Sequence, residues 1–248
     1  MTLWGGRFEG SPAQALWRFT VDTSDRRLLV DDVVGSLRLG VIPTMAPYLL
    51  PTVVREICRR YPLAELTLVE SKTADLCDQL ATGELDLGLL ATPVPEIGPA
   101  MTTADLAHAP FVLALPVGHP FAGRSRLPQS ALSSLPMLLL EEGHCLRSHA
   151  QAACSAIGAS TQSTTQATSL PAACQMVAAG MGVTLLPASA IEVEARAGSG
   201  ITVRRVRRPE PFRTISLVWR SRAGRSERYA QLADALAEPV RSACTLRA

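Results

Sequence analysis

Short apolar runs alternate along the chain with segments in which apolar residues recur every three or four positions. The runs predict strands at residues 37–42, 66–69, 111–115, 183–186 and 214–219, and a turn that leads into a buried strand at 83–90. A further apolar run at 137–140 leads to the motif around Cys145. The periodic segments predict helices, one with Leu50, Val53, Val54, Ile57 and Tyr61, and a last one with Tyr229, Leu232, Ala233 and Leu236 on its inner face. Strands that alternate with helices predict a mostly parallel, doubly wound α/β fold.

Several residues mark where the predicted helices begin. Pro47 and Pro51 fit a first helical turn, where backbone amides have no intrahelical acceptor. Thr44 is placed to cap that helix, and Thr73 and Ser169 hold the same position before two later helices. The end of a strand beside the start of a helix is also where open α/β sheets bind ligands, so Thr44 has a second candidate role.

Composition and charge narrow the class of protein. The chain has 248 residues, 47% hydrophobic and 19% charged, which is enough for a core in one large domain or two lobes. Its net charge of +2 favours neither nucleic acid nor membrane. Basic clusters at residues 204–208 and 220–225 are interpreted as solvated strand ends and loops. Without a transmembrane run or a leader, the chain is expected to be cytoplasmic and without a membrane partner.

The cysteines of a cytoplasmic protein are expected to be reduced. There are six of them: Cys58, Cys77, Cys145, Cys154, Cys174 and Cys244. No pair has CxxC spacing and the four histidines are scattered, which argues against a metal site. We also expect no cofactor.

The strongest chemical signal is the sequence EEGHCLR at residues 141–147, followed by Cys154. His144 and Arg147 flank Cys145, and neighbouring cations hold a thiol as thiolate, the form that reacts with oxidants. The alternative is that both cysteines are small buried apolar side chains, which is the usual role of a free cysteine.

The predicted local structure favours a redox switch. Gly143 ends an apolar run, and a helix is predicted from Leu146 onward with Ala150, Ala153 and Ile157 on one face. Cys145 therefore stands near a helix N-terminus, where the helix dipole favours negative charge. An intact helix would hold Cys145 and Cys154 about 13 Å apart. A disulfide needs Cα atoms within roughly 7 Å, so bridging them would require remodelling of the helix.

Residues 1–36 resemble the N-terminus of argininosuccinate lyases. The resemblance rests on LWGGRF at 3–8, SDRRL at 24–28 and DVVGS at 32–36. The chain then continues as a strand instead of the lyase helix, and the helical bundle and signature loop of that family are not found in it. We therefore expect a fusion remnant without lyase activity.

Residues 37–248 resemble the effector-binding domain of LysR-type transcription regulators. The matching segments are LRLGVIPTMAPYLLP, GELDLGLL, LPVGHPFA, ATSLPAACQMVAAGMGVTLLP and the last helix. Within that family, EEGHCLRSHAQAAC is similar to the OxyR type of peroxide sensor. The resemblance implies a two-lobed, type 2 periplasmic-binding-protein fold, with one lobe at about 37–107 and 222–248 and the other at about 108–221.

The resemblance also implies roles for seven residues. In the redox site, Cys145 matches the peroxidatic cysteine and Cys154 the resolving cysteine, with His144 and Arg147 as the neighbours that shape the site. Thr44 and Thr73 match the threonines that line the peroxide pocket, and Arg220 matches a basic residue near the redox loop.

Three functions follow from these patterns. The first is a hydrogen peroxide sensor that regulates transcription; because it would turn over once per signal, it is not classed as an enzyme. The second is a domain that binds a small-molecule effector between its lobes near Thr44, and the third, a lyase, is rejected. We expect a homodimer. LysR-type regulators reach DNA through an N-terminal helix-turn-helix, which residues 1–36 are too few to supply.

Overall fold

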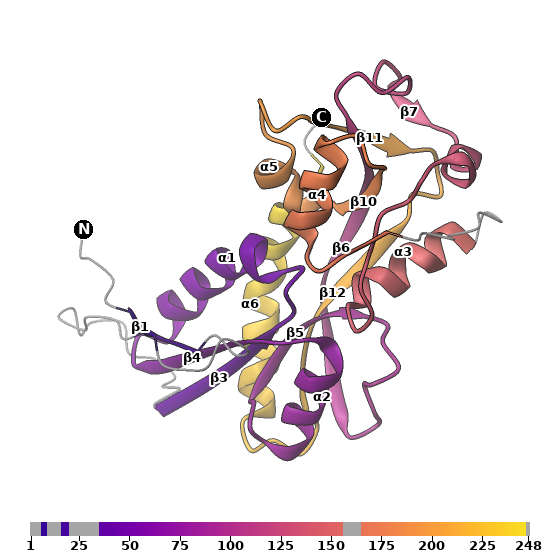
Figure 1. Ribbon diagram of the computed structural model, residues 1–248. Helices are drawn as coiled ribbons and strands as arrows, with labels where there is room; N and C mark the ends of the chain where they lie inside the picture. The colour runs from indigo at the N-terminus through magenta and orange to yellow at the C-terminus, as the bar shows by residue number, and fades with distance from the viewer. Residues whose placement is uncertain (1–5, 9–15, 20–34, 156–164, 247–248) are drawn as a thin grey trace. The chain divides into compact units, whose positions relative to one another are not determined.

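The computed structural model describes residues 6–8, 16–19, 35–155 and 165–246 (Figure 1). The chain divides into two compact units. Unit 1 comprises Met1–Ala107 and Ile215–Val240, and unit 2 comprises His108–Thr214 and Arg241–Ala248. Three elements contribute to both units: strands β6 (Met101–Pro116) and β12 (Phe212–Arg220), and helix α6 (Ser226–Cys244). Among the described residues, no helix is long and apolar enough to cross a membrane.

Unit 1 is built on a sheet with helices α1 (Ala46–Arg60), α2 (Thr73–Thr82) and most of α6. In sheet order its strands are β1 (Gly6–Phe8), β2 (Leu16–Phe19), β4 (Ala64–Glu70), β3 (Gly35–Val41), β5 (Leu87–Thr92), then the unit 1 parts of β12 and β6. Strand β3 pairs parallel with both β4 and β5. The predicted inner face of the last helix is confirmed, because Tyr229, Leu232, Ala233 and Leu236 are all buried.

Unit 2 contains the unit 2 parts of β6 and β12 and several shorter elements. Its strands are β7 (Arg126–Leu127), β8 (Leu139–Leu140), β9 (Gln166–Ala167), β10 (Thr184–Pro187) and β11 (Ile201–Val206). Its helices are α3 (Cys145–Ser155), α4 (Leu170–Ala178) and α5 (Ile191–Glu194), with the 3₁₀ turns η1 (Gln129–Ser134) and η2 (Ala188–Ala190). The small strands β8 and β9 pair parallel and lead into α3 and α4.

The sheet is mixed, which corrects the expectation of mostly parallel strands. Strands β10 and β11 both pair antiparallel with β6, and β2 pairs antiparallel with β4. Parallel pairs in the described part of the chain include β3 with β4 and β5, β7 with β11, and β8 with β9. A strand that is buried on both faces is a continuous apolar run in either orientation, so the sequence pattern could not distinguish the two.

The starts of the helices confirm one predicted cap and correct two. Ser169 caps α4, where its Oγ accepts a hydrogen bond of 3.2 Å from the amide of Ala172. Helix α1 begins after Met45, so Thr44 lies one residue before the N-cap position. Thr73 is the first residue of α2, with Lys72 at the N-cap. Pro51 lies inside α1 and not in its first turn.

The N-terminal segment contributes two strands to unit 1. Strand β1 pairs antiparallel with β2, and β2 pairs antiparallel with β4. Residues predicted only as a fusion remnant therefore extend the sheet beyond β4 (Figure 1). Residues 1–5, 9–15 and 20–34, which carry most of the lyase-like motifs, lie outside the described part of the chain.

Candidate functional site

The motif around Cys145 joins the end of β8 to the start of α3. Strand β8 ends at Leu140, Gly143 takes a left-handed conformation with φ +87°, and Cys145 is the first residue of α3. A positive φ is readily adopted only by glycine, so Gly143 fixes this sharp turn. The predicted position of Cys145 at a helix N-terminus is confirmed, and there the helix dipole favours a negatively charged sulfur.

The side chains at the start of α3 are buried. Cys145 and His144 are each only 7% exposed. Leu146 and Ala150 are also buried, which confirms the inner face predicted for this helix as far as Ala150. Ala153 and Ile157, the other predicted members of that face, lie outside the described side chains. The thiol is thus sheltered from bulky reagents.

His144 has an acidic neighbour one turn before it. Its Nε2 lies 3.9 Å from Oε1 of Glu141, which is an ion pair when the imidazole is protonated. The amide of Glu141 donates a 3.0 Å hydrogen bond to the carbonyl of Ala167, next to the β8–β9 pair. Strand β9 therefore holds the backbone of Glu141 in place. Because Glu141 begins the turn that carries His144, this bond also positions that turn.

Arg147 ties the first turn of α3 to β8. Its Nη1 donates a 2.9 Å hydrogen bond to the carbonyl of Leu140, and its amide donates a 2.9 Å bond to the carbonyl of His144. The guanidinium group is thereby kept in the same turn as Cys145. A cation fixed beside a helix N-terminus adds to the field that favours a thiolate.

Arg147→Ala is expected to slow alkylation of Cys145 by iodoacetamide about threefold to tenfold at pH 7, because the thiolate loses a nearby cation. Peptide-resolved mass spectrometry across pH 5–9 measures this rate for Cys145 alone. Arg196→Ala removes an exposed arginine from the same unit and serves as the matched control. An unchanged pH profile in Arg147→Ala would exclude Arg147 from activation of the thiol.

Cys154 belongs to the same helix, but its side chain lies outside the described part of the structure. Helix α3 is continuous from Cys145 to Ser155. Nine residues of helix separate the two Cα atoms by about 13 Å, well beyond the span of a disulfide. The predicted helical spacing of the two cysteines is therefore confirmed, whereas a bridge between them stays a prediction.

In the other four cysteines, burial favours the neutral thiol. Burial, with a smaller contribution from Glu96 and Asp78, raises the pKa of Cys77 to about 11. Burial raises the pKa of Cys174 to about 12 and of Cys244 to about 11. The pKa of Cys58 is also raised by burial. At pH 7 a thiol with pKa 11 is thiolate in about one molecule in ten thousand, against about three in a hundred for an ordinary cysteine.

Thr44 and Thr73 belong to unit 1, at equivalent positions on neighbouring parallel strands. Thr44 follows the last residue of β3 by three positions, and Thr73 follows the last residue of β4 by three. They are 2% and 4% exposed. Because β3 and β4 are parallel, both hydroxyls stand at the carboxyl edge of the unit 1 sheet, the edge where α/β proteins bind ligands.

The structure adds two hydroxyl groups that sequence reasoning missed. The Oγ1 of Thr92 lies 2.7 Å from the Oγ of Ser216, and Ser216 donates a 2.8 Å hydrogen bond to Oδ1 of Asp105. Thr92 is the last residue of β5, the third parallel strand of unit 1. Its place at a strand end was a signal that could have found it. Ser216 lies within an apolar strand, and its partner could not be foreseen.

Arg220 is held inside unit 1. Its Nη1 donates hydrogen bonds to the backbone carbonyls of Leu80 and, at 3.0 Å, of Leu85. These carbonyls flank the turn at Gly83, which has a φ of +87°. In this structure Arg220 therefore braces the turn between α2 and β5, and its predicted place near the redox loop stays a prediction. Among the described residues, no group of three or more His, Cys, Asp or Glu side chains is placed to hold a metal ion.

Comparison with known proteins identifies the family. A protein-family model described as the LysR substrate binding domain matches residues 31–241. One solved structure, of the reduced form of OxyR, superimposes with a TM-score of 0.76 and 39% identity over 84% of this chain and 96% of the other. The chain belongs to the family of LysR substrate-binding domains, with their type 2 periplasmic-binding-protein fold.

Within that family it is an OxyR-like regulatory domain. It is 43% identical over 213 residues to a probable hydrogen peroxide-inducible genes activator of Mycobacterium avium, covering 86% of this chain and 68% of the relative. It is 40% identical over 202 residues to the DNA-binding transcriptional dual regulator OxyR of Escherichia coli, covering 82% of this chain and 65% of that protein. A cysteine mutant of the Corynebacterium glutamicum OxyR superimposes with a TM-score of 0.80 at 35% identity, covering 86% and 66% of the two chains.

The chain spans about two thirds of the length of these curated relatives. The comparisons do not support the resemblance of residues 1–36 to argininosuccinate lyases. The match to the LysR domain itself begins at residue 31, inside that segment. The expectation of a lyase-like N-terminal fragment is therefore withdrawn.

Proposed function

We propose that this chain is the hydrogen peroxide-sensing domain of a transcription regulator, and that it switches by forming a disulfide between Cys145 and Cys154. The observation that carries the proposal is the position of Cys145. It is a buried thiol at a helix N-terminus, with Arg147 fixed in the same turn and a second cysteine in the same helix. Relatives named as hydrogen peroxide-inducible genes activators support the choice of oxidant.

The chemistry requires two steps and no cofactor. The thiolate sulfur of Cys145 attacks one peroxide oxygen, the O–O bond breaks, and hydroxide leaves and is protonated to water, so that Cys145 becomes a sulfenic acid. The thiolate of Cys154 then attacks that sulfur, the S–O bond breaks, and a second water is released as the disulfide forms. Peroxide takes up the two electrons, and a cellular dithiol or glutathione restores the reduced pair. Because each signal turns the switch once, we propose a sensor and not an enzyme.

Thr44 and Thr73 are proposed to hydrogen-bond the peroxide. Buried hydroxyls can donate to one peroxide oxygen and accept from the other, which orients a small polar molecule. The same two hydroxyls favour the second candidate function, binding of a small polar effector. Titration of the Thr44→Val variant separates the two, because a sensor without the threonine loses reaction rate with peroxide yet still ends in the same disulfide.

A short pulse of peroxide is expected to link Cys145 to Cys154 while Cys58, Cys77, Cys174 and Cys244 stay reduced. The physical reason is the raised pKa of these four thiols, which leaves few thiolates to react. Tryptic mapping under non-reducing conditions, with free thiols blocked in acid, identifies the bridge. Oxidation at Cys77 or Cys174 with Cys145 untouched would contradict the proposed sensor.

The wider setting is proposed from the relatives. We propose that the domain works in the cytoplasm as a homodimer, and that sequence-specific DNA binding belongs to a helix-turn-helix of the regulator. Lyase chemistry is not proposed.

A further inference from the structure

The small net charge of the chain hides two units of opposite sign. Unit 2 has eleven arginines, no lysine and five glutamates, a formal net charge of +6. Unit 1 has 13 basic and 17 acidic side chains, a formal net charge of −4. The low overall charge therefore does not exclude an anionic partner, since binding depends on the local field and not on the total.

Six of the unit 2 arginines lie on or beside two paired strands. We call this group the basic corner: Arg124, Arg126, Arg204, Arg205, Arg207 and Arg208. Strands β7 and β11 pair parallel, with Arg126 opposite Arg205. The amide of Arg207 donates a 2.8 Å hydrogen bond to the carbonyl of Leu127, which continues the pairing beyond β11. The two strands thus bring together arginines that are far apart in the sequence.

One carboxylate lies among these arginines. Arg205 binds Glu210 through two hydrogen bonds of 2.9 Å, and Arg126 adds a third of 3.2 Å to Oε1. The hydrogen bond from Arg205 is the main cause of the lowered pKa of Glu210. The positive charges of Arg205, Arg126 and Arg208 lower this pKa further. Glu210 therefore stays charged and cancels one positive charge, which leaves the corner at about +5.

The outermost arginines are free to bind an external anion. Arg207 and Arg208 are exposed, and in the described part of the chain their side chains make no hydrogen bond or ion pair. Arg124 is exposed too and lies over the ring of Phe121, with its Cζ 5.1 Å from the ring centre. A guanidinium group with open donors matches two oxygens of a phosphate or carboxylate at once.

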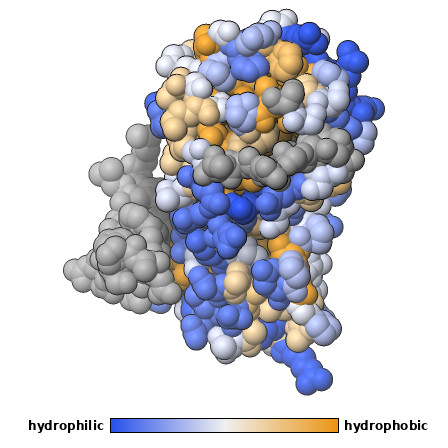
Figure 2. Space-filling view, turned by 45° about the vertical axis from the view of Figure 1, so that its right-hand side comes forward, coloured by the Kyte–Doolittle hydropathy of each residue, from blue (hydrophilic) through white to orange (hydrophobic). Residues whose placement is uncertain are grey.

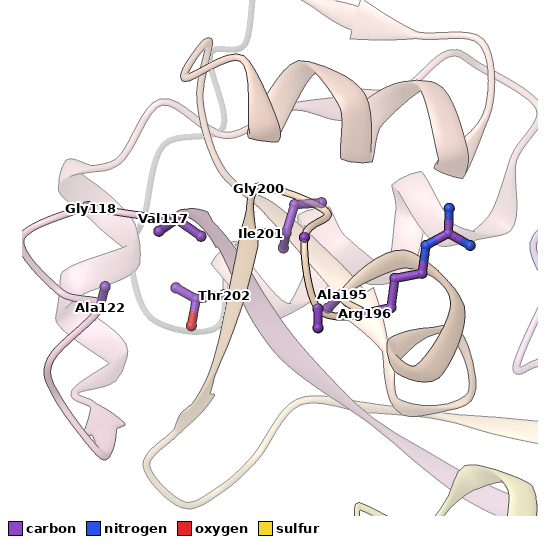
Figure 3. A pocket seen from close by; sticks show the side chains of 10 residues that line it. Val117, Gly118, Ala122, Ala195, Arg196, Gly200, Ile201 and Thr202 are labelled. Carbon is purple, nitrogen blue, oxygen red and sulfur yellow. The ribbon is translucent and has the colours of Figure 1, made fainter.

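The surroundings favour an extended anion over a small bound acid. A cavity of about 590 Å³ lies beside Arg204. Its lining includes Ala122 and Thr202, which both accept hydrogen bonds from Arg204. Its lining is mostly small and apolar, and Figure 3 shows the Arg196 side chain reaching away from the other labelled side chains. The cavity thus lacks converging charged groups. The arginines do not line it, and Arg124, Arg126, Arg207 and Arg208 are exposed. Figure 2 shows one face of the molecule, with strongly hydrophilic side chains along its upper right margin.

The composition of the surface favours nucleic acid over an acidic protein. Protein interfaces usually need a desolvated apolar or aromatic centre. The exposed residues 123–126 and 207–209 at the basic corner include no large apolar side chain, and Phe121 is half-buried beneath Arg124. Protein–DNA interfaces are more polar and far more positively charged. We propose that the basic corner binds the phosphate backbone of duplex DNA without sequence preference, as a second contact beside any operator-reading module.

Fluorescence anisotropy with a labelled, scrambled duplex of about 30 base pairs tests this on the reduced 248-residue chain between about 25 and 200 mM salt. The double variant Arg207→Gln, Arg208→Gln is expected to bind about tenfold or more weakly at the lowest salt. The slope of log affinity against log salt should flatten by about 2, because each arginine removed leaves one phosphate without its protein cation. Neither side chain makes a hydrogen bond or ion pair among the described residues, and both are exposed, so the fold should be retained.

The matched control is Arg60→Gln, Arg222→Gln, which removes the same charge from exposed positions of unit 1. It should leave both affinity and slope unchanged. An equal decrease in the control would show that only total charge matters, and would overturn the assignment of the site. Binding of polyglutamate as tight as binding of the duplex would also overturn it, in favour of an acidic protein partner.

Discussion

Replacing Cys145 with serine is expected to abolish the response to peroxide. Without the Cys145 sulfur no sulfenic acid forms at the start of α3, and the remaining described thiols are held neutral by burial. Dimedone labelling of Cys145→Ser after a peroxide pulse should therefore fall to the level of untreated protein. No disulfide should appear on non-reducing mass analysis.

The reverse substitution should trap the intermediate. In Cys154→Ser, Cys145 still reacts but has no partner, so dimedone labelling should exceed that of the unsubstituted chain and persist. Cys174→Ser is the matched control: it alters a buried thiol of the same unit whose pKa is about 12, and should leave the response intact. Equal labelling of Cys145→Ser and Cys154→Ser would remove the distinction between a peroxidatic and a resolving cysteine.

The sequence was most informative where local chemistry decides local structure. A glycine that adopts a positive φ and an apolar helical face were enough to predict that Cys145 stands at a helix start. Ser169 was recognised as a cap for the same reason. The errors at Thr44 and Thr73 are shifts of one residue, the usual uncertainty of a helix boundary. Thr44 still lies at the sheet edge where the sequence placed it, and Thr73 lies at the same edge.

Long-range pairing could not be predicted from the pattern. Strand β6 begins at Met101, ten residues before the predicted strand at Phe111. The sequence pattern missed this first half because it contains polar residues such as Thr102 and Asp105. That half is stabilised by its neighbours in the sheet and not by its own hydrophobicity. The contact of Asp105 with Ser216 joins residues 111 positions apart, and no local signal encodes such a bond.

The proposed switch depends on how firmly α3 is held. An isolated helix of eleven residues is marginal in water, so α3 depends on its packing and its first-turn contacts. Burial of Leu146 contributes roughly 1.5–3 kcal/mol, and the bond from Arg147 to the Leu140 carbonyl about 1 kcal/mol more. We propose that oxidation of the two thiols by peroxide releases more than these few kilocalories and can therefore displace the helix.

Oxidation is therefore expected to unfold α3. The two cysteines cannot bridge while nine residues of helix separate them, so the amides of residues 149–155 should lose their helical hydrogen bonds. Hydrogen exchange followed by mass spectrometry should show at least a hundredfold loss of protection there, about 3 kcal/mol at 1.4 kcal/mol per factor of ten. The amides of α4 (Leu170–Ala178) should stay protected and provide the internal reference.

The oxidised Cys154→Ser variant separates the two chemical steps. It carries a sulfenic acid on Cys145 but no bridge, so its α3 amides should keep their protection if the disulfide, and not oxidation itself, displaces the helix. Loss of protection in this variant would assign the change to the sulfenic acid. Full protection in the bridged, unsubstituted chain would mean that the disulfide joins two copies, because within one chain an intact α3 holds the sulfurs too far apart.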